Sequence, residues 1–95
     1  MTPRAPAIRA CVLGLLSQRA ATASICPSQV ARALGTQHPQ GWRALMEPVR
    51  EQARHLANEG VIVITQGSQA LAPDRPFDGP IRLRRGPGFM AQNEG

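Results

Sequence analysis

Apolar residues recur at helical spacing in three stretches of the chain, and each stretch predicts a helix. The first helix is expected at about residues 6–20. The second is shorter, at about residues 27–34, because Pro27 suits the first helical position and Cys26 the N-cap before it. Gly35 then follows as a natural C-terminal cap residue.

The third stretch predicts a helix from about residue 41 to 59. Pro48 lies inside it, yet the apolar positions keep their phase on both sides of this proline. Two unrelated helices would more readily lose that phase, so we expect one helix with a kink at Pro48. The apolar positions are Trp42, Leu45, Met46, Val49, Ala53, Leu56 and Ala57.

The second half of the chain has the pattern of strands. Residues 61–65 are apolar at nearly every position, which predicts a strand with two apolar faces, and residues 69–72 suggest a brief return beside it. Residues 81–85 alternate apolar and charged side chains, which predicts one buried and one charged face. Between them, residues 73–80 are rich in Pro, Asp and Gly and predict an irregular loop.

Three helices followed by a two-stranded hairpin is the plan of a winged helix-turn-helix domain. We therefore expect a mainly α fold with a small antiparallel β-hairpin as its wing, at residues 1–85, and a flexible C-terminal tail at residues 86–95. The length of 95 residues fits one domain. We expect one core that contains Leu15, Val30, Leu34, Leu45, Val49, Leu56, Ile81 and Leu83.

The chain is positively charged, and every basic residue is arginine. Eleven arginines against six acidic residues give a formal net charge of +5. Arginine offers a planar fork of donors that suits phosphate and guanine. Codon bias in an Ala- and Arg-rich genome would give the same composition, so the charge is compatible with nucleic-acid binding but does not demand it.

Three arginines of the third predicted helix form a stripe beside its apolar face. Arg43, Arg50 and Arg54 fall within about 40° of one another on a helical wheel. A recognition helix needs such side chains to reach phosphates and guanine edges in the major groove. The alternative is a solvated face, because the helix also carries three glutamates at pairing distances.

The last predicted strand is a second candidate for contact with nucleic acid. Arg82, Arg84 and Arg85 lie in it, and alternation puts Arg82 and Arg84 on one face. No acidic residue lies between Asp78 and Glu94, so the strand is suited to phosphates across a groove. The alternative is that these charges protect an outer strand against edge-to-edge pairing.

Cys26 has the position of a reactive thiol, because the N-terminus of a helix can lower the pKa of a cysteine. No second cysteine lies near it in the sequence and no His/Asn set is evident, so we interpret Cys26 as a capping or buried residue. His38 and His55 show no ligand spacing with either cysteine. We accordingly expect no enzyme, and no metal, cofactor or small-molecule ligand.

The N-terminal region imitates a secretory signal, with an apolar run at residues 10–16 and small residues at 21–23. We reject this interpretation because Gln18 and Arg19 interrupt it and cleavage would remove the first helix. No stretch approaches the ~20 apolar residues of a membrane span. The two cysteines make no disulfide framework, so we expect a cytoplasmic protein without membrane contact.

Two functions follow from these features. The first is binding of duplex DNA, as in a small transcriptional regulator, through Arg43, Arg50, Arg54, Arg82, Arg84 and Arg85. The second is protein interaction or homodimerisation through the Val61–Ile64 region, because one sheet face and one helix layer would leave part of a two-sided apolar strand uncovered.

Several motifs in the chain resemble those of a known family. They are Ser24-Ile25-Cys26-Pro27-Ser28 with Val30-Ala31-Arg32-Ala33-Leu34, Trp42-Arg43 with Leu45-Met46 and Pro48-Val49-Arg50, Ile64-Thr65-Gln66, and Gly79-Pro80-Ile81-Arg82-Leu83-Arg84. Over about residues 8–85 they resemble an uncharacterised bacterial family of small winged-helix-like proteins of unknown function. The resemblance implies a fold and a bacterial cytoplasmic origin, and it implies no activity. The chain also resembles the broader winged-helix superfamily, in which DNA-binding and protein-interaction members both occur.

Overall fold

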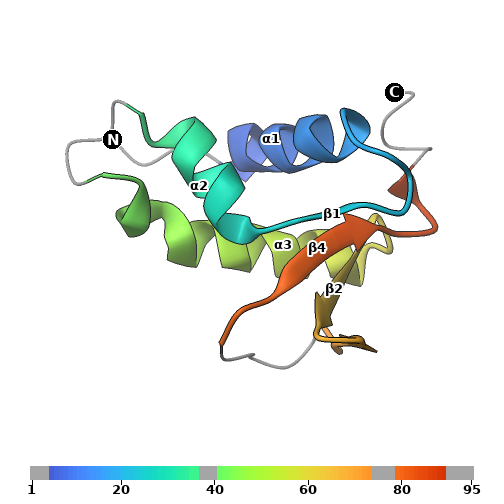
Figure 1. The fold of residues 1–95 in the computed structure, drawn as a ribbon. Helices are drawn as coiled ribbons and strands as arrows, with labels where there is room; N and C mark the ends of the chain where they lie inside the picture. Colours follow the sequence, from blue (N-terminus) through green and yellow to red (C-terminus); the bar gives the residue numbers. More distant parts are fainter. Residues whose placement is uncertain (1–4, 37–40, 74–78, 90–95) are drawn as a thin grey trace.

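A computed structural model of the protein describes residues 5–36, 41–73 and 79–89. Within these residues the elements are α1 (Ala5–Ser17), β1 (Ser24–Ile25), α2 (Pro27–Leu34), the 3₁₀ helix η1 (Trp42–Leu45), α3 (Met46–Asn58), β2 (Ile62–Gln66), β3 (Gln69–Ala70) and β4 (Arg82–Arg85) (Figure 1). The three α-helices and the antiparallel sheet confirm the predicted fold class and are compatible with a small winged-helix-like fold.

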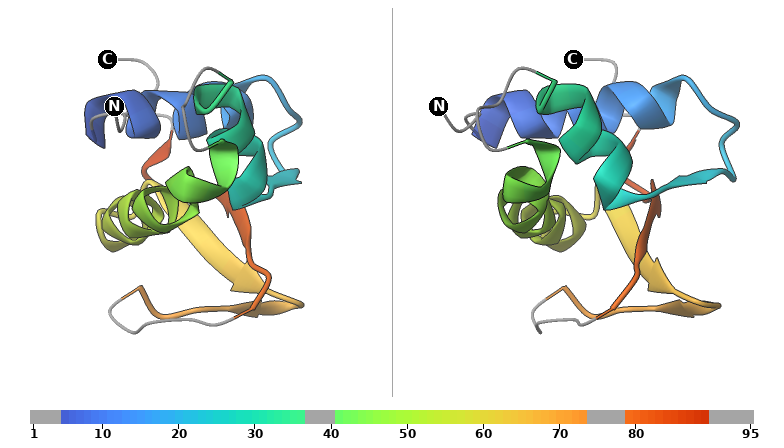
Figure 2. Two further views of the ribbon diagram at one scale, coloured as in Figure 1. Left: turned by 90° about the vertical axis from the view of Figure 1, so that its left-hand side faces the viewer. Right: turned by 60° about the vertical axis from the view of Figure 1, so that its left-hand side comes forward.

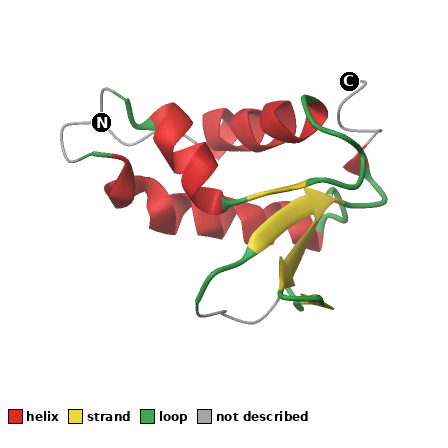
Figure 3. Ribbon diagram, viewed as in Figure 1, coloured by secondary structure: helices red, strands yellow, loops and turns green. Residues whose placement is uncertain are grey.

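The strands form one antiparallel sheet in the order β1-β4-β2-β3 (Figure 3). β4 lies inside the sheet, where Leu83 pairs with Ile64 of β2 on one side and with Ile25 of β1 on the other. The strand β1 was not predicted, because two residues have no periodicity that could reveal a strand. β1 lies before α2 in the chain and pairs with β4 near the other end. The sheet therefore joins the N-terminal and C-terminal parts of the chain.

The structure corrects the start of the third predicted helix and the kink at Pro48. A 3₁₀ helix ends at Leu45 and the α-helix begins at Met46, so Pro48 lies in the first helical turn. The backbone N–H groups of this turn have no intrahelical partner, and proline therefore loses no hydrogen bond there. Leu45 and Val49 are both buried, so the apolar phase continues although the backbone geometry changes.

The first two helices agree with the sequence in different degrees. α2 spans the predicted residues, and Cys26 is its N-cap as expected. α1 ends at Ser17, before the predicted residue 20. The reason is a tight turn, because the N–H of Arg19 donates to the carbonyl of Leu16 at 3.1 Å and the helix does not continue. None of the described helices is long and apolar enough to cross a membrane.

The core lies between the helices and the inner face of the sheet (Figure 2). α1 and α2 each pack against α3, and α3 packs against β2. The predicted core residues that are buried are Val30, Leu45, Val49, Leu56, Ile81 and Leu83. Leu15 and Leu34 are only partly buried at the edge of the core, because Ile8, Val12 and Leu16 form the buried row of α1.

The structure corrects the boundary of the predicted C-terminal tail. Phe89 is 1% exposed and belongs to the core. The N–H groups of Gly86 and Gly88 donate to the carbonyls of Val61 and Gly60 at 2.9 and 2.8 Å. A Cβ atom at Gly86 would stand 2.6 Å from the carbonyl oxygen of Gly60, so this close approach requires glycine. The rest of the predicted tail lies outside the described residues.

Candidate nucleic-acid interface

The arginines of β4 hold the connection between α1 and β1. Arg82 donates to the side-chain and backbone oxygens of Ser24 at 2.9 and 3.0 Å, and Arg84 donates to the carbonyl of Thr22 at 2.6 Å. Both side chains lie on the exposed face of the strand, as the alternation predicted. Because β4 lies between β1 and β2, these charges do not protect an edge strand, and that alternative no longer explains them.

Arg85 has a different environment on the inner side of β4. Its guanidinium group donates to the carbonyls of Leu16 and Arg19 at 3.0 and 2.8 Å, and lies 4.7 Å from the centre of the Phe89 ring. A cation is favourable at the C-terminal end of α1, where the last carbonyls and the helix dipole point toward it. Arg85 therefore contributes to the fold through contacts that its sequence pattern did not predict.

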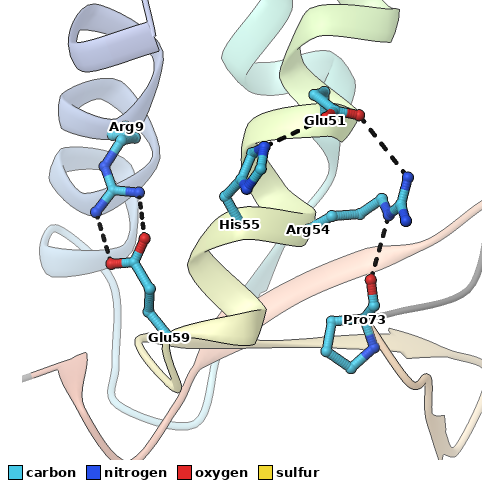
Figure 4. Close-up of polar contacts among 6 residues, drawn as sticks. All are labelled: Arg9, Glu51, Arg54, His55, Glu59 and Pro73. Carbon is cyan, nitrogen blue, oxygen red and sulfur yellow. Dashed lines mark hydrogen bonds and ion pairs between the residues drawn. The ribbon is translucent and has the colours of Figure 1, made fainter.

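The predicted arginine stripe is divided between two elements. Arg43 lies on η1, whereas Arg50 and Arg54 lie on α3. Arg50 donates to the carbonyl of Gly79 at 2.9 Å. Figure 4 shows the second contact, in which Arg54 donates to the carbonyl of Pro73 at 3.2 Å. Because Pro73 and Gly79 flank the loop between β3 and β4, these two arginines join that loop to α3.

All acidic side chains of the described residues lie on α3 or at its C-cap. Glu59 accepts two hydrogen bonds from Arg9 at 2.8 and 2.9 Å, and these bonds hold the pKa of Glu59 below its usual value. Glu51 lies 3.2 Å from His55 and 3.8 Å from Arg54 (Figure 4). The exposed side of α3 is therefore mixed in charge, with its acids close to cations.

A second surface carries four arginines and a tryptophan. It comprises the exposed side chains of Arg32, Arg43, Arg82 and Arg84 together with the partly buried Trp42, and we call it the basic face. Within the described parts of the chain, none of these four arginines forms an ion pair. All four arginines lie in the two segments, residues 1–46 and 79–93, that contain no aspartate or glutamate.

Trp42 and Cys26 connect three of the arginines of the basic face. Arg32 of α2 and Arg43 of η1 each lie 4.6 Å from the centre of the Trp42 ring. Arg32 and Arg82 are both close enough to Cys26 to act on its thiol. Figure 1 shows β1, β4 and the start of α2 together in front of α3. The basic face thus extends from η1 over α2 to the sheet.

Cys26 lies between the cations of the basic face. Its N–H donates to the side-chain oxygen of Gln29 at 2.7 Å, and the Ser28 hydroxyl donates to its sulfur at 3.1 Å. Burial raises the pKa of the thiol, but the hydrogen bonds from Ser28 and the charges of Arg82 and Arg32 give a net lowering. The capping role predicted for Cys26 is confirmed.

The apolar region proposed for dimerisation is mostly covered within the chain. Val61, Ile62 and Ile64 are buried, and Val63 alone is partly exposed. Val63 lies opposite Arg84 in the sheet, so its surroundings on the outer face are charged. The described sheet therefore offers no broad apolar patch at this strand.

Sequence reasoning did not identify Arg32 and Trp42 as part of a surface. Trp42 was placed on the apolar face of a helix, and Arg32 was read only as part of a family motif. The signal that could have found them is the long stretch without acidic residues, which leaves the arginines of that stretch without local ion-pair partners. His38, which was considered as a metal ligand, lies outside the described residues.

Comparison with known proteins identifies the family of the chain. A family model described as protein of unknown function (DUF3253) matches residues 5–86. No curated protein matches the chain. The matched residues include all three α-helices and all four strands, and they confirm the predicted resemblance to an uncharacterised family. The chain belongs to the family of proteins of unknown function named DUF3253.

Proposed function

We propose that the protein binds duplex DNA through the basic face, as a cytoplasmic binding protein without enzymatic activity. The observation that supports this is the set of four exposed arginines without ion pairs among the described residues. Contacts between cations and backbone phosphates supply most of the affinity of non-specific DNA binding, and the release of counterions makes it depend on salt. A continuous cationic surface without acids is suited to such contacts.

In this proposal the main contacts do not come from α3. The carboxylate of Glu51 lies 3.8 Å from Arg54 and reduces the positive charge on that side of α3. A phosphate near α3 would also meet the carboxylates of that helix. In the basic face, Arg84 and Arg82 come from the sheet and Arg32 from α2, and no described ion pair neutralises them.

The alternative function, dimerisation through Val61–Ile64, was motivated by an apolar face that the helices leave uncovered. Three of the four side chains are buried within the chain, so this motivation is absent. We retain DNA binding as the single proposal.

The test is fluorescence anisotropy with a labelled random-sequence duplex at low and at physiological salt. We expect affinity to fall with salt, with a log–log slope of about −0.9 per phosphate neutralised. Arg84→Gln should reduce that slope by about one unit. Arg9→Gln is the matched control, because it removes the same charge from a residue already paired with Glu59, and it should leave the slope unchanged.

A third variant separates the basic face from α3. If α3 supplied the main contacts, Arg54→Gln would weaken binding more than Arg84→Gln. Absence of binding at low salt with tens of micromolar folded protein would refute the proposal as a whole. Circular dichroism of each variant confirms that the fold is retained.

A further inference from the structure

We infer that Arg32, Trp42 and Arg43 form a preorganised phosphate-binding cluster, in which Trp42 is a positioning residue for both guanidinium groups. The inference names a subsite of the basic face and rests on the proposed function for its macromolecular ligand. The ligand chemistry is that of neighbouring phosphate groups.

The geometry of stacking leaves the donors of both arginines available. Each guanidinium carbon lies 4.6 Å from the ring centre of Trp42, within the ~6 Å range of cation–π attraction. A guanidinium group that stacks on a ring uses its flat face, and its N–H donors point outward in its own plane. In the part of the chain that the structure describes, neither Arg32 nor Arg43 uses these donors in a hydrogen bond or ion pair.

Close packing between α2 and η1 fixes the backbone position from which the Trp42 side chain extends. A Cβ atom at Gly35 would stand 2.7 Å from the Cα of Trp42 and 2.9 Å from its Cβ. Gly35 has a φ of −97°, which other residues also adopt, so the glycine is required for space and not for an unusual backbone conformation. The indole therefore lies where it can contact Arg32 from α2 and Arg43 from its own turn.

This arrangement favours an anion for two reasons. Two like charges held on one ring repel each other, and no described acid pairs with either of them. A polyanion whose neighbouring phosphates contact the two cations would relieve that repulsion and accept charge-assisted hydrogen bonds. Because the ring already orders two long side chains, part of the entropy loss of binding occurs before the ligand arrives.

Trp42 is the one tryptophan of the chain, so its fluorescence reports directly on the cluster. The experiment titrates the protein with a short DNA duplex and, separately, with sodium tripolyphosphate against sodium chloride of equal ionic strength. We expect a saturable change of Trp42 emission with both probes. Arg32→Gln and Arg43→Gln should each weaken the response several-fold, the double variant should abolish it, and Arg9→Gln should not alter it.

Two further variants test the positioning role of the ring while keeping both charges. Trp42→Leu should weaken duplex binding several-fold in anisotropy with little change in salt slope, because the number of cations is the same. Trp42→Phe should restore part of the loss, because phenylalanine also offers a ring face. Equal affinities for wild type, Trp42→Leu and Trp42→Phe would overturn the positioning role.

The outcomes separate the cluster from the proposed function. If duplex binds while Trp42 emission is constant and both arginine variants behave like Arg9→Gln, the cluster is refuted and DNA binding stands. If tripolyphosphate changes the emission of the wild type but not of the double variant, and duplex does not bind, the cluster stands and DNA binding is refuted. Absence of both responses refutes both.

Discussion

The burial of Phe89 predicts that residues beyond the last strand are essential for stability. Phe89→Ala would remove a ring that is 1% exposed, and truncation of a buried phenylalanine to alanine typically costs about 3–5 kcal/mol. Arg85 would also lose the ring that lies 4.7 Å from its guanidinium carbon.

The expected loss is large for a domain of this size. A small domain unfolds with a free energy of about 5–15 kcal/mol, so Phe89→Ala should remove roughly a fifth of it or more. Each kcal/mol changes Tm by about 4–8 °C in a domain of 60–100 residues, which corresponds to a decrease of at least about 12 °C.

Urea unfolding followed by circular dichroism measures this free energy, and thermal melting gives Tm. Phe89→Leu is the matched control, because it keeps most of the apolar volume and should cost clearly less than Phe89→Ala. A loss below about 0.5 kcal/mol for Phe89→Ala, the range of ordinary surface substitutions, would show that this residue is outside the core.

Three other predictions concern different parts of the molecule. Leu56→Ala removes a fully buried side chain of α3 and should cost about 2–5 kcal/mol in the same urea assay, and a loss near zero would contradict the core described above. The pKa of Glu59 is lowered in the folded chain, so its contribution to stability is present above the unfolded pKa and is lost as pH falls through the folded pKa. Arg9→Gln should therefore make Tm less dependent on pH in the acid range. If Tm of the variant and of the wild type depended on pH in the same way, a role of the Arg9–Glu59 pair would be excluded. Cys26 should react with iodoacetamide at lower pH than Cys11, because the pKa of Cys26 is lowered and burial raises the pKa of Cys11. Mass spectrometry measures the labelling of each cysteine against pH, and coincident profiles would refute this difference.

Sequence periodicity predicted the helices and strands that depend on residues close together in the sequence. α2 has both a start signal at Cys26-Pro27 and an apolar stripe, and its bounds agree with the prediction. The change from 3₁₀ to α geometry at Met46 was missed, because both geometries keep Leu45 and Val49 on the buried side. β1 was missed because its pairing partner, β4, lies far along the chain.

The same distinction applies to the candidate site. The alternation in β4 correctly placed Arg82 and Arg84 on an exposed face. The contacts of Arg85 could not be predicted, because the carbonyl of Leu16 that it binds lies 69 positions away in the sequence. The contact between Arg32 and Trp42 likewise depends on the close approach of two segments at Gly35, which composition and helical wheels do not report.

The place of β4 inside the sheet has a consequence for the order in which the protein folds. β1 pairs only with β4 among the described strands, and the end of α1 binds a side chain of β4, so both N-terminal features depend on residues 82–85. Contacts of such high sequence separation slow folding, because the intervening chain must be ordered before they form. During synthesis, α1 and α2 leave the ribosome well before their strand partner. We expect the native state to form in one late step, when β4 pairs with β2 and with the segment that becomes β1.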